Sequence, residues 1–127
     1  WKQTKGVLGM DKMTIDEKAI GICSENIKQS ALQSRAYKGR EELIGQLCEE
    51  CGELVVAAQK LRRVWSETTK ISMDEAYMNL AEECADVLNA IEALEHINLI
   101  DMECVNRIRA HKAYRWKHRI VDGDWSE

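Results

Sequence analysis

The chain contains no proline, and this absence constrains its fold more than any other feature of the sequence. Proline breaks helix interiors, and together with glycine it supplies the turns that separate short strands. Only seven glycines occur in 127 residues, and Ala, Glu, Lys, Leu and Ile are abundant. This composition favours long helices, so we predict an all-α fold.

Length and charge narrow the classes of protein further. A chain of 127 residues with 45% hydrophobic residues fits one domain with its own core and excludes global disorder. The net charge of −4 argues against general binding to nucleic acid or to anionic lipid. We therefore expect no nucleic-acid partner and no membrane partner.

The sequence also indicates a compartment. No stretch approaches the roughly 20 apolar residues of a membrane span, and none resembles a secretory signal. Five cysteines are an odd number in a chain long enough to fold without disulfides. We expect a cytoplasmic protein with reduced thiols.

Apolar periodicity predicts four helices with short connections. Ser72 and Glu75 are spaced as a capping box, and Asp101 can cap the last helix, which is expected to end before Asp122. Residues 1–13 show little periodicity and are interpreted as a flexible N-terminal arm or leader, which leaves 14–127 as one all-α domain. The predicted helices cover about 14–33, 43–63, 73 to 94 or 96, and 102–119.

Two of these helices share a sequence pattern. The segment LCEECGEL at 47–54 aligns with LAEECADV at 80–87, position by position and without a gap. Two copies are too few for a solenoid, which needs about three repeats to bury a continuous core. The pattern instead indicates a pair of helices related by an approximate twofold axis.

Acidic residues recur at helical spacing in both copies. At about 100° per residue, one helix gathers Glu49, Glu50 and Glu53 within an arc of roughly 100°. The same spacing gathers Glu82, Glu83 and Asp86 on the other helix. Packing two such stripes side by side is costly unless cations lie between them. Ligands that are all oxygen, with no histidine in either stripe, suit Mg²⁺ or Mn²⁺, and Mg²⁺ commonly shares its coordination shell with phosphate oxygens.

A structural interpretation of these acids is that they line the solvated faces of two amphipathic helices. Glu49 and Glu50 lie among Leu47, Leu54 and Val55, with few basic residues nearby to pair with them. The doubled arrangement on two helices favours the metal interpretation, and a nucleotide or another polyphosphate follows as the expected substrate.

The motif Glu49-Glu50-x-x-Glu53, followed by Glu83-x-x-Asp86, resembles that of the all-α nucleoside triphosphate pyrophosphohydrolases, the MazG-like superfamily. The resemblance spans about 39–119 and implies a four-helix, homodimeric or homotetrameric enzyme. It implies that Glu50, Glu53, Glu83 and Asp86 hold Mg²⁺, or Mn²⁺, and that Glu49 orients or deprotonates the attacking water. The implied reaction cleaves a (d)NTP into a (d)NMP and pyrophosphate, as in the sanitising of nucleotide pools. The motif does not indicate the base.

Basic residues on the last predicted helix are candidates for phosphate binding. Lys112-x-x-Arg115 looks like the basic motif on the last helix of many superfamily members, and Arg109 and Arg119 extend it at helical spacing. Some members carry Lys-x-x-x-Asn instead, and position 116 here is Trp. The alternative is a basic face that serves solubility or pairs with acidic groups.

Other motifs support rival interpretations. Cys48-x-x-Cys51 in mid-helix is a weak signal for zinc or redox chemistry and is interpreted as two small buried hydrophobic residues. No histidine of the sequence has a glutamate three residues before it, so the Glu-x-x-His motif is absent, which argues against a di-iron bundle. The remaining alternatives are a phosphoribosyl-ATP pyrophosphatase and a non-enzymatic helical interaction module. Four aromatic residues could stack on a base or pack in the core: Tyr37, Trp65, Tyr77 and Trp116.

Overall fold

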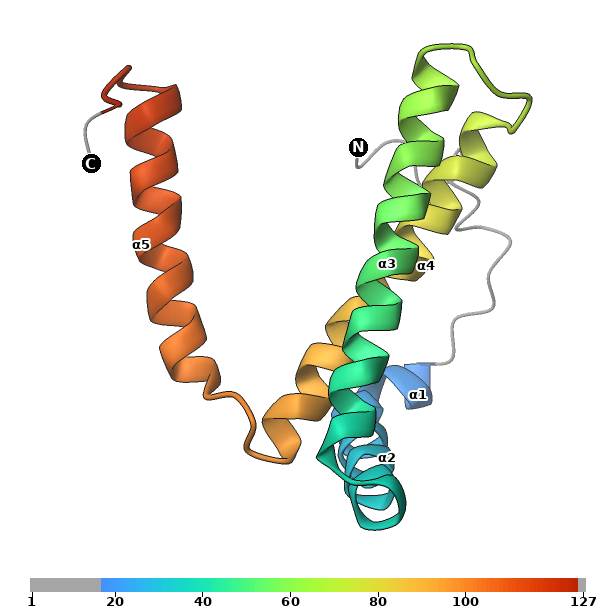
Figure 1. The fold of residues 1–127 in the computed structure, drawn as a ribbon, viewed down its shortest axis with the longest axis vertical. Helices are drawn as coiled ribbons and strands as arrows, with labels where there is room; N and C mark the ends of the chain where they lie inside the picture. The colour runs from blue at the N-terminus through green and yellow to red at the C-terminus, as the bar shows by residue number, and fades with distance from the viewer. Residues whose placement is uncertain (1–16, 126–127) are drawn as a thin grey trace. The chain divides into compact units, whose positions relative to one another are not determined.

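The computed structural model describes residues 17–125, and all regular secondary structure within this range is helical (Figure 1). The predicted all-α class is therefore confirmed for the described chain, whereas the predicted arm at 1–13 lies outside the described residues. The helices are α1 (Glu17–Gly21), α2 (Cys23–Lys38), α3 (Arg40–Trp65), α4 (Met73–His96) and α5 (Met102–Ile120).

The first predicted helix is divided into α1 and α2 by an irregularity at Ile22, whose backbone has φ −114° and ψ 14°. Gly21, a poor helix former, precedes it. Ile22 still takes part in two hydrogen bonds of helical spacing, because its N–H donates to the Lys18 carbonyl (3.2 Å) and its carbonyl accepts the Asn26 N–H (2.9 Å). α1 and α2 are therefore separate helices that adjoin at this one residue.

The end of α2 lies five residues beyond the predicted end near Gln33, and the expected break over 34–39 is confined to Gly39. Gly39 has φ +81°, a backbone region that favours glycine, and α3 begins at the next residue. The predicted boundaries of the later helices are confirmed more closely. The Ser72 hydroxyl accepts the Glu75 N–H at the start of α4 (3.2 Å), and the Asp101 carboxylate accepts the Glu103 N–H at the start of α5 (2.9 Å).

The chain divides into two compact units, one ending at Ile97 and one beginning at Asn98. In the first unit, α3 and α4 form an antiparallel hairpin, and α2 packs against both helices (Figure 1). Ser24 on α2 and His96 on α4 are hydrogen bonded at 3.4 Å. The second unit consists of α5 and the residues that flank it, and no residue of α5 is buried. The expected single four-helix bundle is therefore not confirmed.

The core of the first unit is thin. Its buried hydrophobic residues within the described range include four alanines, and the larger members come from α3, α4 and the residue after α4. Cys48 and Cys51 are exposed, so their interpretation as buried hydrophobic residues is wrong for the single chain. None of the described helices combines the length and apolar character that a membrane span requires. The buried residues are Ala31, Leu43, Ala57, Leu61, Ala76, Ala90, Leu94 and Ile97.

Candidate metal centre

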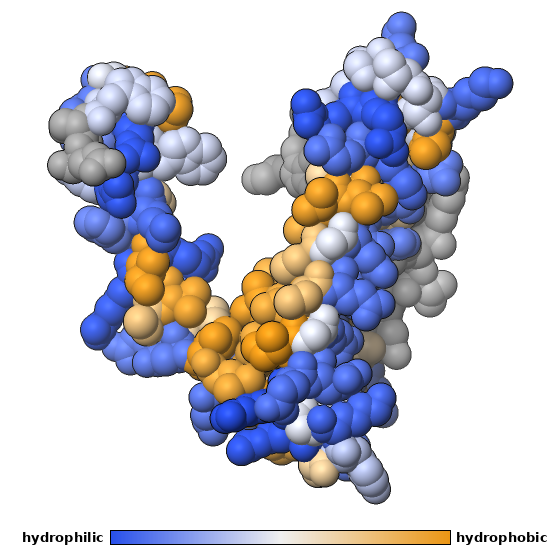
Figure 2. Space-filling view, viewed as in Figure 1, coloured by the Kyte–Doolittle hydropathy of each residue, from blue (hydrophilic) through white to orange (hydrophobic). Residues whose placement is uncertain are grey.

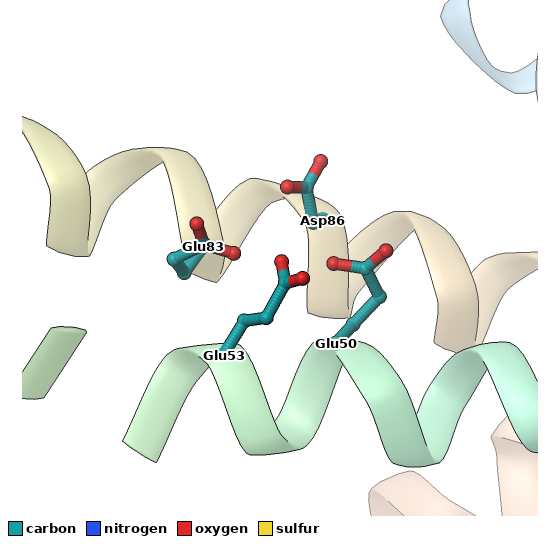
Figure 3. Close-up of side chains that lie close together, drawn as sticks. All are labelled: Glu50, Glu53, Glu83 and Asp86. Atoms are coloured by element: carbon teal, nitrogen blue, oxygen red, sulfur yellow. The ribbon is translucent and has the colours of Figure 1, made fainter. Parts of the chain in front are cut away.

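Four carboxylates meet between the two helices of the hairpin (Figure 3). Glu50 and Glu53 come from α3, and Glu83 and Asp86 come from α4. One ligand oxygen from each residue can be chosen so that all four oxygens lie within 4.8 Å of one another. This is the group of four that the motif resemblance assigns to the metal.

The helical repeat explains why these four side chains meet. Residues three apart lie on the same face of a helix, one turn from each other, so each helix contributes a pair. The alignment of 47–54 with 80–87 relates Glu50 to Glu83 and Glu53 to Asp86. Because α3 and α4 run antiparallel, their equivalent pairs face each other across the hairpin.

Two of the carboxylates have an oxygen that is buried and lacks a hydrogen-bond partner. These atoms are Glu50 Oε2 and Glu83 Oε2, and both side chains are half-buried, whereas Glu53 and Asp86 are more exposed. A buried carboxylate oxygen without a hydrogen-bond partner destabilises the fold, because folding removes the water that hydrates it and no protein group replaces the lost hydrogen bonds. A divalent cation bound by the four carboxylates would satisfy these oxygens, so the residues present fit a hard metal ion.

Electrostatics support the same interpretation. Burial is the largest cause that raises the pKa of Glu50 above its ordinary value of 4.5, and the charges of Asp86, Glu53 and Glu49 raise it further. Burial is also the largest cause that raises the pKa of Glu83. The charge of Glu53 and a hydrogen bond with the Glu53 carboxylate raise this pKa further, as do the charges of Asp86 and Glu50. The cluster therefore resists accumulating negative charge unless a cation compensates it.

Burial of these carboxylates, together with the repulsion between them, predicts a pH dependence of the metal-free fold. The pKa values of Glu50 and Glu83 are raised on folding, so above pH 4.5 the folded state retains protons that the unfolded chain has lost. The free energy of unfolding contributed by these groups is therefore largest at low pH and falls as the pH rises through the raised pKa values. Thermal melts in EDTA are expected to show a lower Tm at pH 7.5 than at pH 5.5.

Other groups of the protein also titrate between these two pH values. The variant Glu50→Gln is therefore used to isolate the contribution of the carboxylate cluster to the free energy of unfolding. The fall in Tm between the two pH values is expected to be smaller in Glu50→Gln than in the parent chain. Adding Mg²⁺ to the parent at pH 7.5 should recover the lost stability. An equal fall in both proteins, unaffected by Mg²⁺, would contradict this description of the cluster.

The other predicted site residues lie outside the group of four. Glu49 is exposed on α3, where its charge contributes to the raised pKa of Glu50. Lys112 and Arg115 are exposed on α5 and share one face with other basic residues and one tryptophan. This basic face belongs to the second unit, so its role in phosphate binding stays a prediction. The face comprises Arg109, Lys112, Arg115, Trp116 and Arg119.

A pocket of about 280 Å³ borders the cluster within the first unit. Glu50 and Asp86 form part of its lining, and each of the three helices around it contributes one amide side chain: Asn26 from α2, Gln46 from α3 and Asn89 from α4. Sequence reasoning missed these three amides. Their signal could not be found in the sequence, because the amides are far apart along the chain and meet only through the packing of α2.

Comparisons with protein-family models, with curated proteins and with solved structures found no match. The function is therefore inferred from the residues and geometry of the site.

Proposed function

We propose that this protein is a Mg²⁺-dependent nucleotide pyrophosphohydrolase of the MazG-like type, which cleaves a (d)NTP into a (d)NMP and pyrophosphate. The observation that carries the proposal is the group of four carboxylates from two antiparallel helices, with ligand oxygens within 4.8 Å of one another. Two buried oxygens without partners, on Glu50 and Glu83, support a bound cation over a solvated acidic surface.

The donor set favours Mg²⁺ or Mn²⁺. Glu50, Glu53, Glu83 and Asp86 offer only carboxylate oxygens, and among the described residues neither His nor Cys belongs to the group. When bound, Mg²⁺ would neutralise phosphate oxygens and lower the pKa of a coordinated water. The exposed carboxylate of Glu49, next to Glu50 in the chain, is the proposed group that orients the water or accepts its proton.

The pocket that borders the carboxylate cluster supports the proposal that the polyphosphate substrate is a nucleotide. Its lining, within residues 17–125, contains no Lys or Arg, so it is unsuited to phosphate, but it offers amides, hydroxyls and apolar side chains. Amide side chains can recognise the adjacent donor and acceptor groups on the edge of a nucleobase. We therefore place the nucleoside in the pocket and the phosphates at the carboxylate cluster, where Glu50 and Asp86 border both.

A panel of standard and modified (d)NTPs tests the proposal. Release of pyrophosphate and monophosphate is measured with Mg²⁺ and with EDTA, and phosphoribosyl-ATP is included as the substrate of the rival enzyme. We expect metal-dependent release from at least one nucleoside triphosphate. Release from phosphoribosyl-ATP alone would favour the rival enzyme, and no release from any compound would contradict an enzymatic role.

A further inference from the structure

Helix α2 contacts the hairpin less extensively than the two hairpin helices contact each other. Apolar residues gather in a band along α3 and α4 (Figure 2), whereas α2 buries only one of its residues, Ala31. No side chain caps the start of α2, in contrast to the starts of α4 and α5. Parts of a fold with few buried apolar contacts separate from it at a low free-energy cost. Among the three helices around the pocket, α2 is therefore the one that moves most readily.

The two ends of α2 permit such a movement. A single residue, Gly39, connects α2 to α3, and its φ of +81° lies in a region that favours glycine. Ile22 interrupts the helical geometry at the other end. Ser24, near that end, is bonded to His96 of α4 at 3.4 Å, which is long for a hydrogen bond. Once this weak bond breaks, α2 can pivot about Gly39, because changes of φ and ψ at one residue are enough to reorient a helix.

The pocket beside the carboxylate cluster is lined by α2 on one side and by the hairpin on the other, so a pivot of α2 changes its size. Its volume of about 280 Å³ is slightly below the roughly 300–1,000 Å³ of typical ligand sites. Outward movement of α2 would widen the pocket for a nucleoside, and the return movement would enclose it. The lining residues that move with α2 are Asn26, Ile27, Ser30, Ala31 and Ser34.

The lining also contains hydrogen-bonding groups that the protein leaves unused. Within residues 17–125, the amide side chains of Asn26, Gln46 and Asn89 have no hydrogen-bond partner. Each amide offers both donors and an acceptor. Gln46 and Asn89 belong to the hairpin, whereas Asn26 is carried by α2. A nucleoside in the pocket can therefore bond to the hairpin first and to Asn26 when α2 closes.

We propose that α2 is a lid, which pivots about Gly39 to admit the nucleoside and then closes over it, bringing Asn26 to the base. This inference rests on the proposed function, because it requires the nucleoside to occupy this pocket. Closure removes water from the nucleoside and fixes it beside Glu50 and Asp86, which border both the pocket and the cluster. The contacts that form only on closure make the bound state favour the closed lid.

A thiol placed under the lid reports its opening. Ala31 is 1% exposed, and Ala31→Cys places a thiol on the buried side of α2. Ala57→Cys, at a position of α3 that is 3% exposed, is the matched control within the hairpin. Alkylation is followed by mass spectrometry, which localises the modified thiol. Without nucleotide, we expect the thiol of Ala31→Cys to react at least about tenfold faster than that of Ala57→Cys, because opening of α2 exposes only the first.

Product binding is expected to close the lid. The nucleoside monophosphate, which the proposed reaction does not hydrolyse further, is added with Mg²⁺ at concentrations where calorimetry shows binding. Alkylation of Ala31→Cys should slow at least about tenfold, and that of Ala57→Cys should not change. Equal rates at the two positions without nucleotide, or an unaffected Ala31→Cys with bound product, would overturn the lid. Either result together with hydrolysis in the nucleotide panel refutes the lid alone, whereas no binding of any nucleotide refutes the proposed function and the lid with it.

Gly39→Ala tests the hinge in a chain without an added thiol. A Cβ at Gly39 would lie 3.0 Å from the Glu41 Oε2 atom, and alanine is strained at φ +81°, so α2 is displaced from its closed position. We expect KM to rise at least about tenfold with a smaller change in kcat, whereas the calorimetric Mg²⁺ affinity should match the parent. Gly45→Ala, inside α3 with no atom within 4 Å of the added Cβ, is the matched control and should keep the parent KM. Circular dichroism verifies that both variants are folded, and an unchanged KM in Gly39→Ala would contradict the pivot.

Discussion

Replacing Glu53 by Gln is expected to reduce nucleotide hydrolysis by more than about 100-fold, and Asp86→Asn should have the same effect. Loss of a partner outside the coordination shell typically costs about 10- to 100-fold in metal affinity or activity, and these two residues are proposed as ligands themselves. Initial rates at saturating nucleotide and several Mg²⁺ concentrations provide the measurement. Glu42→Gln, an exposed glutamate on α3 outside the cluster, is the matched control and should retain activity.

The same variants separate a metal-binding role from loss of the fold. In EDTA, replacing one carboxylate by an amide removes repulsion within the group of four, so Glu53→Gln is expected to melt at a higher temperature than the parent chain. With Mg²⁺ the order should reverse, because only the parent gains stability from binding. Near-normal activity in both Glu53→Gln and Asp86→Asn would refute the metal assignment.

Filling the pocket beside the cluster is the second substitution with a large expected effect. Ser30 lines the pocket from α2 and is itself exposed, so Ser30→Leu adds volume there without disturbing the core. We expect KM to rise about 10- to 100-fold with a smaller change in kcat, because the nucleoside contacts are lost while the carboxylates are retained. This corresponds to about 1.4–2.7 kcal/mol of binding free energy.

A control on the same helix makes this result specific. Gln33→Leu introduces the same side chain at an exposed position of α2 outside the pocket lining, and its kinetics should match the parent. Mg²⁺ affinity, measured by calorimetry without nucleotide, should be the same in Ser30→Leu and the parent. An unchanged KM in an active Ser30→Leu enzyme would exclude the pocket as the nucleoside site and leave the metal site intact.

Local periodicity predicts two acidic stripes, one on each helix of the hairpin, and the motif resemblance selects four of their six residues as the candidate ligands. Spacings of three residues on two helices require only that each helix forms, and the repeat between 47–54 and 80–87 indicated that the two helices pair. The starts of α4 and α5 were predictable for the same reason, since Ser72 and Asp101 cap their helices through hydrogen bonds to residues two or three positions away.

Features that depend on packing could not be predicted in this way. The pocket amides meet only because α2 lies across the hairpin, and the sequence contains no local signal of that contact. The exposure of Cys48 and Cys51 could not be predicted, because the sequence pattern of an apolar stripe is the same whether or not the rest of the chain covers that stripe. The predicted end of α2 is too early because residues 34–38 lack apolar periodicity. The helix nevertheless continues through them, since they contain no helix breaker before Gly39.

The products of hydrolysis test the central claim most directly. The preferred nucleotide from the panel is incubated with the parent chain and Mg²⁺, and the reaction is followed by ³¹P NMR. We predict that the nucleoside monophosphate and pyrophosphate appear together in equal amounts, and that neither appears with EDTA or with Glu53→Gln. Formation of nucleoside diphosphate and inorganic phosphate, or equal rates with and without the metal, would contradict a metal-dependent pyrophosphohydrolase.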